Sequence, residues 1–554
     1  MNKLCINSYL DEKQFSPKAF LRFIHENASL AIASAVTILL VYGVRLTTIC
    51  FGIDTELHIA ENRYINWMAI GRFGLVGLQK LWTNFWAGKE LFNPYLAVLL
   101  ACGFLFFATL TWCYVIDMFS DGSIKRSAYI PFAVVFISHQ VWTEQVYFVL
   151  QSAECLFIVL LSPIAVYYLF YGSAKSSIKE IGFGFLLTVF CTSVYQGVLI
   201  LIYCGIFALF VLFKEHTNLE SKAYTRLCIT LLVLMFASAG AYFAANKIVQ
   251  LALHVRQSDY LVNQLGNDQN SALFTVVNLG VYVYKLVFAH CPPIAHIAEP
   301  IMAKTARTGW KAVEEIRTTS LMSNILLFPA VILFVMQILR NTKKSFLYVA
   351  AAFCVLLCVF ALPIAGGGDA PLRSQYVLPF AIAFVLLYAA SKMNGKVYQI
   401  CIILFALCGA RQTLVCSMLN YSDVMRYKAD VRLSEEIAER IHSIGVSPEI
   451  PVFFYGVHHP QFSGNYIKGE TCACSPFEWA GADDTVDSTY RGVAFMKTQG
   501  YNFSAVKADD EALIQRAREA AETMADFPLP NSVKNMGDVV VVRFSETLYQ
   551  PKEK

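Results

Sequence analysis

Long apolar segments recur along most of this chain, and they constrain its fold more than any other feature. Several are about as long as the 20 residues with which a helix crosses a bilayer. They do not alternate between apolar and polar residues, as the strands of an outer-membrane barrel do. Because a helix satisfies its own backbone hydrogen bonds in lipid, we predict eleven transmembrane helices, at residues 29–51, 94–116, 127–140, 147–171, 181–194, 196–213, 227–246, 321–339, 346–365, 376–391 and 397–415.

The composition excludes an ordinary soluble enzyme and a disordered chain. Of the 554 residues, 56% are hydrophobic and only 15% are charged, against about a quarter in soluble proteins. The net charge of +4 is nearly balanced for this length, so we predict no nucleic-acid partner. Most of the 16 cysteines lie in apolar segments, where cysteine behaves as a small hydrophobic residue. Residues 1–27 are polar and mixed, and we interpret the first apolar segment as an uncleaved helix.

Lysine and arginine are distributed unevenly between the short loops. The loops on one side, near residues 141–146, 195 and 366–375, carry only Arg373. Because positive residues favour the cytoplasmic side, we predict a cytoplasmic N-terminus and, with an odd number of spans, an external C-terminal segment. The positive residues on the predicted cytoplasmic side are Lys3, Lys13, Lys18, Arg22, Lys125, Arg126, Lys175, Lys179, Lys214, Lys222, Arg226, Arg340, Lys343, Lys344, Lys392 and Lys396.

This orientation divides the chain into a transmembrane module, residues 1–415, and an external tail, residues 416–554. The module carries two large outer loops, 51–93 and 247–320, and we interpret the apolar stretch 273–289 as an interfacial segment or hairpin dip. The tail is predicted to form a small α/β domain, because helical periodicity alternates there with short apolar strands. We expect helices at 421–444, 487–498 and 509–524, and strands at 451–457, 502–506 and 539–544.

The first outer loop concentrates the ionisable residues that catalysis would need. Asp54, Glu56 and His58 lie within five residues directly after the first predicted span. An acid at the lipid–water boundary is well placed to remove a proton from an acceptor hydroxyl as a general base. The alternative is that these acids are solvated loop residues. Aromatic residues typical of an interfacial helix pair follow them, namely Tyr64, Trp67, Trp82 and Trp86.

Two arginines are candidates for binding a phosphate. Arg373 follows the glycine run Gly366–Gly368, which lets backbone approach a ligand, and a guanidinium can hold phosphate oxygens with a fork of donors. Its alternative role is to anchor a tight turn, and that of Arg72 is a headgroup contact. Lys304, Arg307 and Lys311 are interpreted as surface residues. Polar residues that either line a cavity or bond between helices are His139, Gln140, Glu144, Gln151, Glu154, Tyr195 and Gln196.

No motif in the sequence predicts a cofactor or a metal ion. His458 and His459 lack a spaced partner, and Cys472 and Cys474 are separated by one residue instead of the two of a zinc knuckle. The sequence contains no Walker A loop and no Rossmann glycine motif. We therefore predict no cofactor and no metal, although Asp54-Thr55-Glu56 comes close to a D-x-D pair.

Several short motifs together resemble one known family. They are Gly52-Ile53-Asp54-Thr55-Glu56, Gly71-Arg72-Phe73, Ser193-Val194-Tyr195-Gln196, Ala370-Pro371-Leu372-Arg373-Ser374, Phe527-Pro528-Leu529-Pro530 and Val539-Val540-Val541-Val542-Arg543. The chain resembles the type II serotype-converting glucosyltransferases of bacterial O-antigen and cell-wall polysaccharides, which belong to the GT-C superfamily. The resemblance implies an inner-membrane enzyme that moves a sugar, glucose in this family, from undecaprenyl phosphate to a polysaccharide on the outer face. It also implies that a flippase and a polyprenyl-phosphate sugar synthase supply the donor.

The resemblance further implies roles for single residues. GT-C enzymes place their catalytic acid in the first outer loop, which points to Asp54, with Glu56 as the second choice. Inverting displacement would use Asp54 as general base and Arg373, with Arg72 as a second candidate, to stabilise the phosphate. His58, Tyr195 and Gln196 complete the expected substrate-binding set. A lipid-linked sugar flippase and a polysaccharide ligase or polymerase stay open as alternatives, although a flippase needs no folded outer domain.

Overall fold

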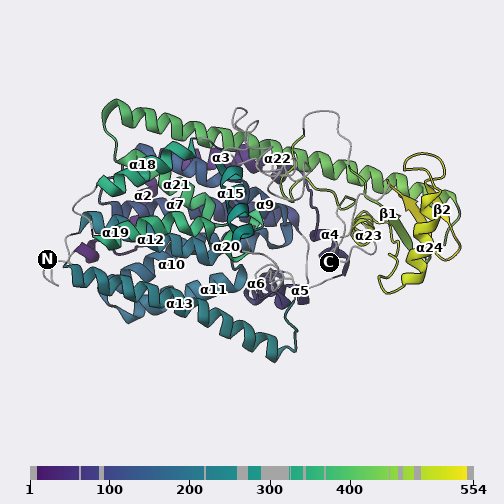
Figure 1. Cartoon of the computed structure of the whole chain (residues 1–554), viewed down its shortest axis with the longest axis horizontal. Coiled ribbons are helices and arrows are strands. Elements are labelled where there is room, and N and C mark those ends of the chain that lie inside the picture. Colours follow the sequence, from purple (N-terminus) through teal and green to yellow (C-terminus); the bar gives the residue numbers. More distant parts are fainter. Residues whose placement is uncertain are drawn as a thin grey trace.

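A computed structural model describes residues 9–61, 64–86, 93–217, 220–258, 272–287, 324, 326–340, 345–366, 370–447, 449–459, 466–478 and 488–545. Most of these residues are helical, and the helices lie side by side in one elongated bundle (Figure 1). A small sheet domain lies beyond one end of that bundle (Figure 1). The mixed architecture predicted from the sequence, many apolar helices followed by a small α/β unit, is therefore confirmed in outline.

Every apolar segment predicted to span the membrane is helical over most of its described residues, although the helix of the first segment ends at Thr47 instead of residue 51. Among the described residues, seven helices are long and apolar enough to cross a bilayer, and three shorter apolar helices are α8 (Tyr129–Ile137), α18 (Leu327–Arg340) and α21 (Val377–Ser391). The number of spans and their orientation stay predictions. The bundle helices are α2 (Pro17–Glu26), α3 (Ala28–Thr47), α7 (Pro94–Ser120), η1 (Arg126–Ala128), α8 (Tyr129–Ile137), α9 (Gln140–Tyr147), α10 (Val149–Lys175), α11 (Ile178–Val194), α12 (Val198–His216), α13 (Ser221–Ala252), α15 (Ala272–Val287), α18 (Leu327–Arg340), α19 (Phe346–Leu357), η2 (Cys358–Phe360), α20 (Ala361–Ala365), η3 (Leu372–Ser374), α21 (Val377–Ser391) and α22 (Gly395–Ser443).

The bundle has a buried centre and an apolar outer surface. Helix α7 packs along α10, and both helices are mostly buried. Helices α3 and α13 instead expose large apolar side chains, such as Leu39 and Phe236, which a bilayer would cover. The cysteines that the structure describes are all free, and most are buried. This agrees with their interpretation as small hydrophobic residues.

Loops that were predicted to share one side of the membrane do contact one another. Four ion pairs join the N-terminal segment or the end of α12 to loops on the same predicted side. This arrangement supports the assignment of these loops to one side of the bundle. The pairs are Lys13–Asp121, Arg126–Glu26, Lys175–Asp11 and Lys392–Glu215.

Helix α22 joins the bundle to the C-terminal domain. It is 49 residues long and runs without a break from the bundle into the domain (Figure 1). The predicted boundary between residues 415 and 416 therefore falls inside one helix. Sequence periodicity showed helix on both sides of that point, but it gave no sign that the two stretches are continuous.

The C-terminal domain is built on a three-stranded sheet of strand order β1-β3-β2. Strand β3 pairs in parallel with β1 and antiparallel with β2. One face packs against α22 and α23, and the other against α24, so that neighbouring residues of β3 enter different cores. The elements are β1 (Val452–Tyr455), α23 (Thr489–Thr498), α24 (Glu511–Glu522), β2 (Val533–Asn535) and β3 (Val540–Arg543).

Two details of this domain differ from the prediction. Residues 502–506 were expected to form a strand, but they contribute only an isolated bridge between Ala505 and Val452. This bridge lies on the edge of β1 away from β3, where Val452 exchanges two backbone hydrogen bonds with Ser504 and Val506. Strand β2 was not predicted, because its Lys534 and Asn535 are exposed and leave no apolar alternation to detect.

Candidate active site

Segments from distant parts of the sequence meet at the end of the bundle that faces the C-terminal domain. Two glycines mark how closely they approach. A Cβ atom at Gly52 would overlap the phenol of Tyr147, and one at Gly197 would overlap the carbonyl oxygen of Ser374. Tyr147 Oη also accepts a hydrogen bond of 2.9 Å from the amide of Ile53. The loop that leads to the candidate acids is thereby fixed against the bundle.

Asp54 comes directly before the short helix α4 (Thr55–Glu61), and Glu56 lies in the first turn of that helix. Both acids contact the same guanidinium group. Asp54 adopts a left-handed backbone with φ of 71°, and its carbonyl accepts the amide of His58. Arg491 on α23 donates from Nη2 to Asp54 Oδ1 at 2.9 Å and from Nη1 to Glu56 Oε1 at 3.0 Å. Helices α4 and α23 lie in contact (Figure 1). Sequence reasoning missed Arg491, which lies 437 residues after Asp54.

The two acids have different electrostatic surroundings. Glu56 is fully buried, and burial, reinforced by the charge of Asp54, raises its pKa to about 7 despite Arg491. The side chain of Asp54 is 45% exposed. Partial burial pushes the pKa of Asp54 upward, but Arg491, Arg373 and His58 outweigh this effect and hold the pKa below its usual value. Asp54 is therefore ionised at neutral pH, whereas Glu56 carries a proton for part of the time.

The predicted phosphate binder Arg373 lies near these acids, as its influence on Asp54 shows. Its Nη1 is 3.7 Å from Glu470 Oε1, and its guanidinium stands 4.9 Å from the ring centre of Phe148. Glu470 also accepts the amide of Leu372 at 2.7 Å. The tail loop thus steadies the segment that carries Arg373, whose side chain is 20% exposed. The glycines 367 and 368 of the predicted binding loop lie outside the described residues.

Arg72, Tyr195 and Gln196 come together in a second cluster. The guanidinium of Arg72 lies 4.2 Å from the ring centre of Tyr195, and its Nη1 donates to Gln151 Oε1 at 3.0 Å. Gln196 Nε2 donates to the carbonyl of Ile70 at 2.8 Å, which holds the turn before α6 (Phe73–Trp86). In this structure Gln196 is therefore an anchor for the turn that presents Arg72.

His58 lies on α4 and is half-buried. Its ring centre is 4.2 Å from that of Trp67 on α5 (Tyr64–Ala69). Its charge contributes to the low pKa of Asp54. A direct role of His58 toward a substrate stays a prediction. Lys304, Arg307 and Lys311 lie outside the described residues.

A family model described as Glucosyl transferase GtrII matches residues 43–390. The chain belongs to this family. The match confirms the resemblance drawn from the sequence, and together with the apolar helices it indicates a membrane glycosyltransferase. No curated protein and no solved structure matches the chain. Asp54 and Arg373 lie within the region shared with the GtrII family, whereas Arg491 lies beyond it.

In this GtrII-family chain, Glu144 binds the tail instead of lining a cavity. It was predicted to lie in a loop, but it belongs to α9 and is fully buried. Its carboxylate accepts the amides of Glu470, Thr471 and Cys472 at 2.7, 3.0 and 2.8 Å, and the Thr471 hydroxyl at 2.6 Å. With Gln140 Nε2, which donates to Oε1 at 3.2 Å, five donors satisfy the charge, so Glu144 fixes the tail loop beside Arg373.

A buried chain of four charges supports the loop that carries Asp54. Arg45 pairs with Asp423 at 2.9 Å, and Arg426 pairs with Asp423 at 2.6 Å and with Asp430 at 2.9 Å. Arg426 Nη2 also donates to the carbonyl of Phe51 at 3.1 Å. Asp423, Arg426 and Asp430 lie at positions i, i+3 and i+7 of α22, so they share one face of the helix. This spacing is the only signal in the sequence that could have indicated the network.

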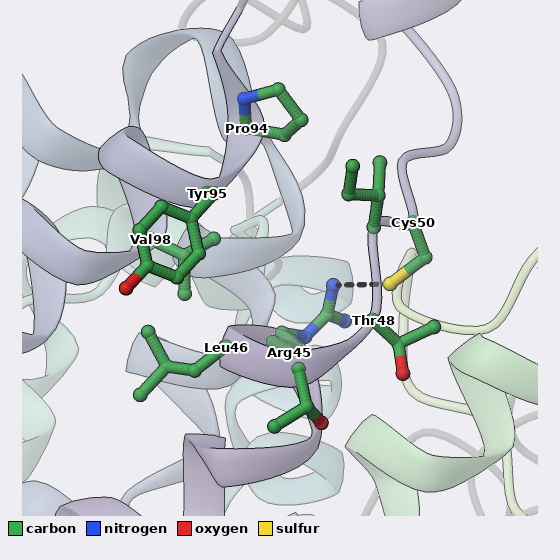
Figure 2. Close-up of a pocket in the computed structure, with 9 residues that line it drawn as sticks. Arg45, Leu46, Thr48, Cys50, Pro94, Tyr95 and Val98 are labelled. Carbon is green, nitrogen blue, oxygen red and sulfur yellow. Dashed lines mark hydrogen bonds between the residues drawn. The ribbon is translucent and has the colours of Figure 1, made fainter.

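A pocket of about 280 Å³ lies beside this network, between the end of α3 and the start of α7 (Figure 2). Pro94, Tyr95 and Val98 line one wall, and Arg45 lies at the base, with Nη1 3.5 Å from Cys50 Sγ (Figure 2). The chemistry of the family offers no assignment for it. Among the described residues, no three His, Cys, Asp or Glu side chains gather closely enough to hold a metal ion.

The raised pKa of Glu56 predicts a specific pH dependence of stability. Its usual pKa is 4.5 and its folded value is about 7, so between these values the folded state binds more protons than the unfolded state. Stability from this group is therefore lost as pH rises through that window. Asp54 and Arg491 are the charged groups that face it. We expect Glu56→Gln to flatten the decline of Tm across this range in detergent, and an unchanged slope would contradict the assignment.

Proposed function

We propose that this protein transfers a sugar, glucose by analogy with the family, from undecaprenyl phosphate to a polysaccharide such as O-antigen on the outer face of the inner membrane. The observation that carries the proposal is the acid pair Asp54 and Glu56, placed directly after an apolar helix in a GtrII-family chain. An ionised acid with one open side and a neighbouring arginine is a suitable arrangement for glycosyl transfer from a phosphate carrier.

The proposed reaction is a single displacement with inversion. The acceptor hydroxyl loses its proton to Asp54, and its oxygen attacks C1 of the sugar from the face opposite the phosphate. The bond between C1 and the phosphate oxygen breaks, and polyprenyl phosphate leaves with the electron pair. Arg373 is close enough to Asp54 to lower the pKa of that carboxyl, and it would offer charge-assisted hydrogen bonds to the phosphate. No metal or other cofactor takes part in this proposal.

The position of the site fits a donor with a lipid tail. The acids lie at the end of the bundle, just beyond the last residue of α3, so a polyprenyl chain could stay in the bilayer while its phosphate reaches Arg373. The C-terminal domain covers the same end and would contact the acceptor glycan. A flippase and a polyprenyl-phosphate sugar synthase would act beforehand to deliver the donor to this face.

Transfer of a labelled sugar tests the proposal. Membranes that contain the protein are incubated with polyprenyl-phosphate-linked radiolabelled glucose and purified glycan, beside membranes that contain Asp54→Asn. We expect label in the glycan with the wild-type protein only. Label that crosses the membrane but stays on lipid would instead support a flippase. Label in glycan only when the donor carries a longer oligosaccharide would support a ligase or polymerase.

The orientation has its own test. We propose that the N-terminus is cytoplasmic and that the tail from residue 416 is external, because the positive loops gather on the other side. A fluorescent reporter that matures only in the cytoplasm should stay dark when fused after residue 554. The same reporter fused before Met1 is the control and should fluoresce. A bright C-terminal fusion would contradict the topology.

A further inference from the structure

The C-terminal domain places a cation inside the candidate active site. Arg491 lies beyond the region that defines the family, yet it contacts both acids within that region. Its side chain is only 13% exposed. Its Nε is buried and has no hydrogen-bond partner among the described residues, and the same holds for Glu56 Oε2. The site therefore has unused hydrogen-bonding capacity on both sides of the ion pair.

Arg491 is presented by a rigid part of the domain. The residues on either side of it are fixed: Thr489 Oγ1 accepts the amide of Phe454 at 2.9 Å, and Tyr490 Oη accepts the amide of Ala508 at 2.7 Å. Gly492 packs so closely on β1 that a Cβ there would lie 2.5 Å from Phe454 Cε2. Since the helix cannot slide on the sheet, the guanidinium is held at the acids with little freedom to move elsewhere.

Two guanidinium groups consequently lower the pKa of Asp54. Arg491 acts by direct contact, and Arg373 acts at longer range. The open part of the Asp54 carboxylate marks the side from which substrate reaches it. An anion that entered there would meet a positive field from both arginines. Arg373 also faces Glu470 at 3.7 Å, whereas the buried Nε of Arg491 has no partner among the described residues, so Arg491 is the cation with a donor left for a further negative group.

We propose that Arg491 is a catalytic residue. It forms ion pairs with Asp54 and Glu56 before the reaction, and it binds the donor phosphate as the sugar leaves. This inference depends on the proposed function. During the displacement the acceptor O–H bond breaks and its proton goes to Asp54, so that carboxylate loses its negative charge. The C1–O bond to phosphate breaks at the same time, and the phosphate gains one negative charge. The partner that attracts Arg491 most strongly thus changes from Asp54 to the phosphate during the reaction.

This change in the strongest electrostatic partner of Arg491 predicts where the effect appears in the kinetics. Because the phosphate gains its extra charge only as the bond breaks, Arg491 stabilises the transition state more than bound donor. We expect its loss to reduce kcat, whereas loss of Arg373 should mainly raise the KM for donor. Lysine at position 491 offers a point charge without the fork, and it should restore part of the rate.

The experiment uses full-length protein in proteoliposomes with polyprenyl-phosphate-linked radiolabelled glucose and purified glycan. Arg491→Ala is expected to lower kcat by roughly 10²- to 10³-fold, with a change of only a few-fold in donor KM. Added guanidinium ions should recover part of the loss, which they would not do for a purely structural residue. Arg516→Ala is the control, because Arg516 pairs with Asp538 on the surface of the same domain.

The outcomes separate this inference from the proposed function. A kcat of Arg491→Ala within about threefold of wild type, or a loss confined to KM, would overturn the inference. If Arg491→Ala does not fold, Arg491→Lys decides, and a wild-type kcat for that variant would also overturn it. Should Asp54→Asn be inactive while Arg491→Ala is active, only this inference fails. Absence of transfer by the wild-type protein would defeat the proposed function itself.

Discussion

Asp54→Asn is expected to lower sugar transfer by roughly 10²- to 10⁴-fold, the usual contribution of general-base catalysis. Asparagine keeps the size of aspartate and part of its hydrogen bonding, but it cannot accept the proton of an acceptor hydroxyl. The low pKa of Asp54 means that the wild-type residue is already ionised and ready at neutral pH. The measurement is the initial rate of transfer at saturating donor, with protein amount and Tm checked in parallel.

The neighbouring acid supplies the matched control. Glu56 is fully buried and its Oε1 is held by Arg491, whereas the side chain of Asp54 is 45% exposed, so an acceptor hydroxyl reaches Asp54 more readily. We expect Glu56→Gln to reduce transfer by less than Asp54→Asn. If Glu56→Gln abolishes transfer while Asp54→Asn stays near wild type, the roles of the two acids are reversed. If both variants stay active, the segment that follows α3 does not carry the catalytic acid.

Arg426→Ala is expected to destabilise the protein by about 3–5 kcal/mol, because it leaves buried carboxylates without their cation. Arg426 is fully buried and pairs with Asp423 and Asp430, and it also holds the carbonyl of Phe51. Its loss removes support from the loop that leads to Asp54. Thermal unfolding in detergent and the yield of folded protein measure the effect.

Arg432→Ala provides a control on the same helix. Arg432 is exposed on α22, and removing it should change stability by no more than about 0.5 kcal/mol. A comparable loss of stability in both variants would show that any substitution on α22 destabilises the protein. The buried charges would then contribute no more to stability than an exposed residue does. Wild-type stability of Arg426→Ala would contradict the role given to the network.

Most of the helical architecture could be predicted from the sequence, because the apolar segments are long and lack strand alternation. The bundle helices cover every predicted segment in the described residues, and α3 begins at Ala28, close to the expected start. The choice of Asp54 and Glu56 as candidate acids also came from the sequence, since both lie in the segment that follows the first apolar helix. Family membership supports that choice but does not test the role of either acid.

Contacts between distant segments could not be predicted in this way. Arg491 reaches Asp54 across 437 residues, and no local pattern distinguishes it from the other arginines of the tail. Glu144 was misjudged for the same reason, because its partners lie in the tail loop and are invisible to periodicity. The continuity of α22 likewise depends on packing against both the bundle and the sheet, which a hydropathy pattern does not report.

The continuous α22 has a mechanical consequence for the site. Its first part packs in the bundle, its middle carries the buried charges, and its end packs on the sheet that holds α23. The domain that presents Arg491 is therefore connected to the membrane module through one rigid element, reinforced by Glu144 and the tail loop. This explains how a residue outside the family region can be positioned accurately against Asp54.

The most direct test of the central claim is the fate of the sugar in a system of defined components. Purified protein in liposomes is supplied with polyprenyl-phosphate-linked glucose labelled at C1 and with purified glycan, and the anomeric configuration of the product is read by NMR. We expect the label in the glycan, with the configuration at C1 opposite to that of the donor, and none with Asp54→Asn. Label that stays on the lipid, or product with retained configuration, would contradict the mechanism.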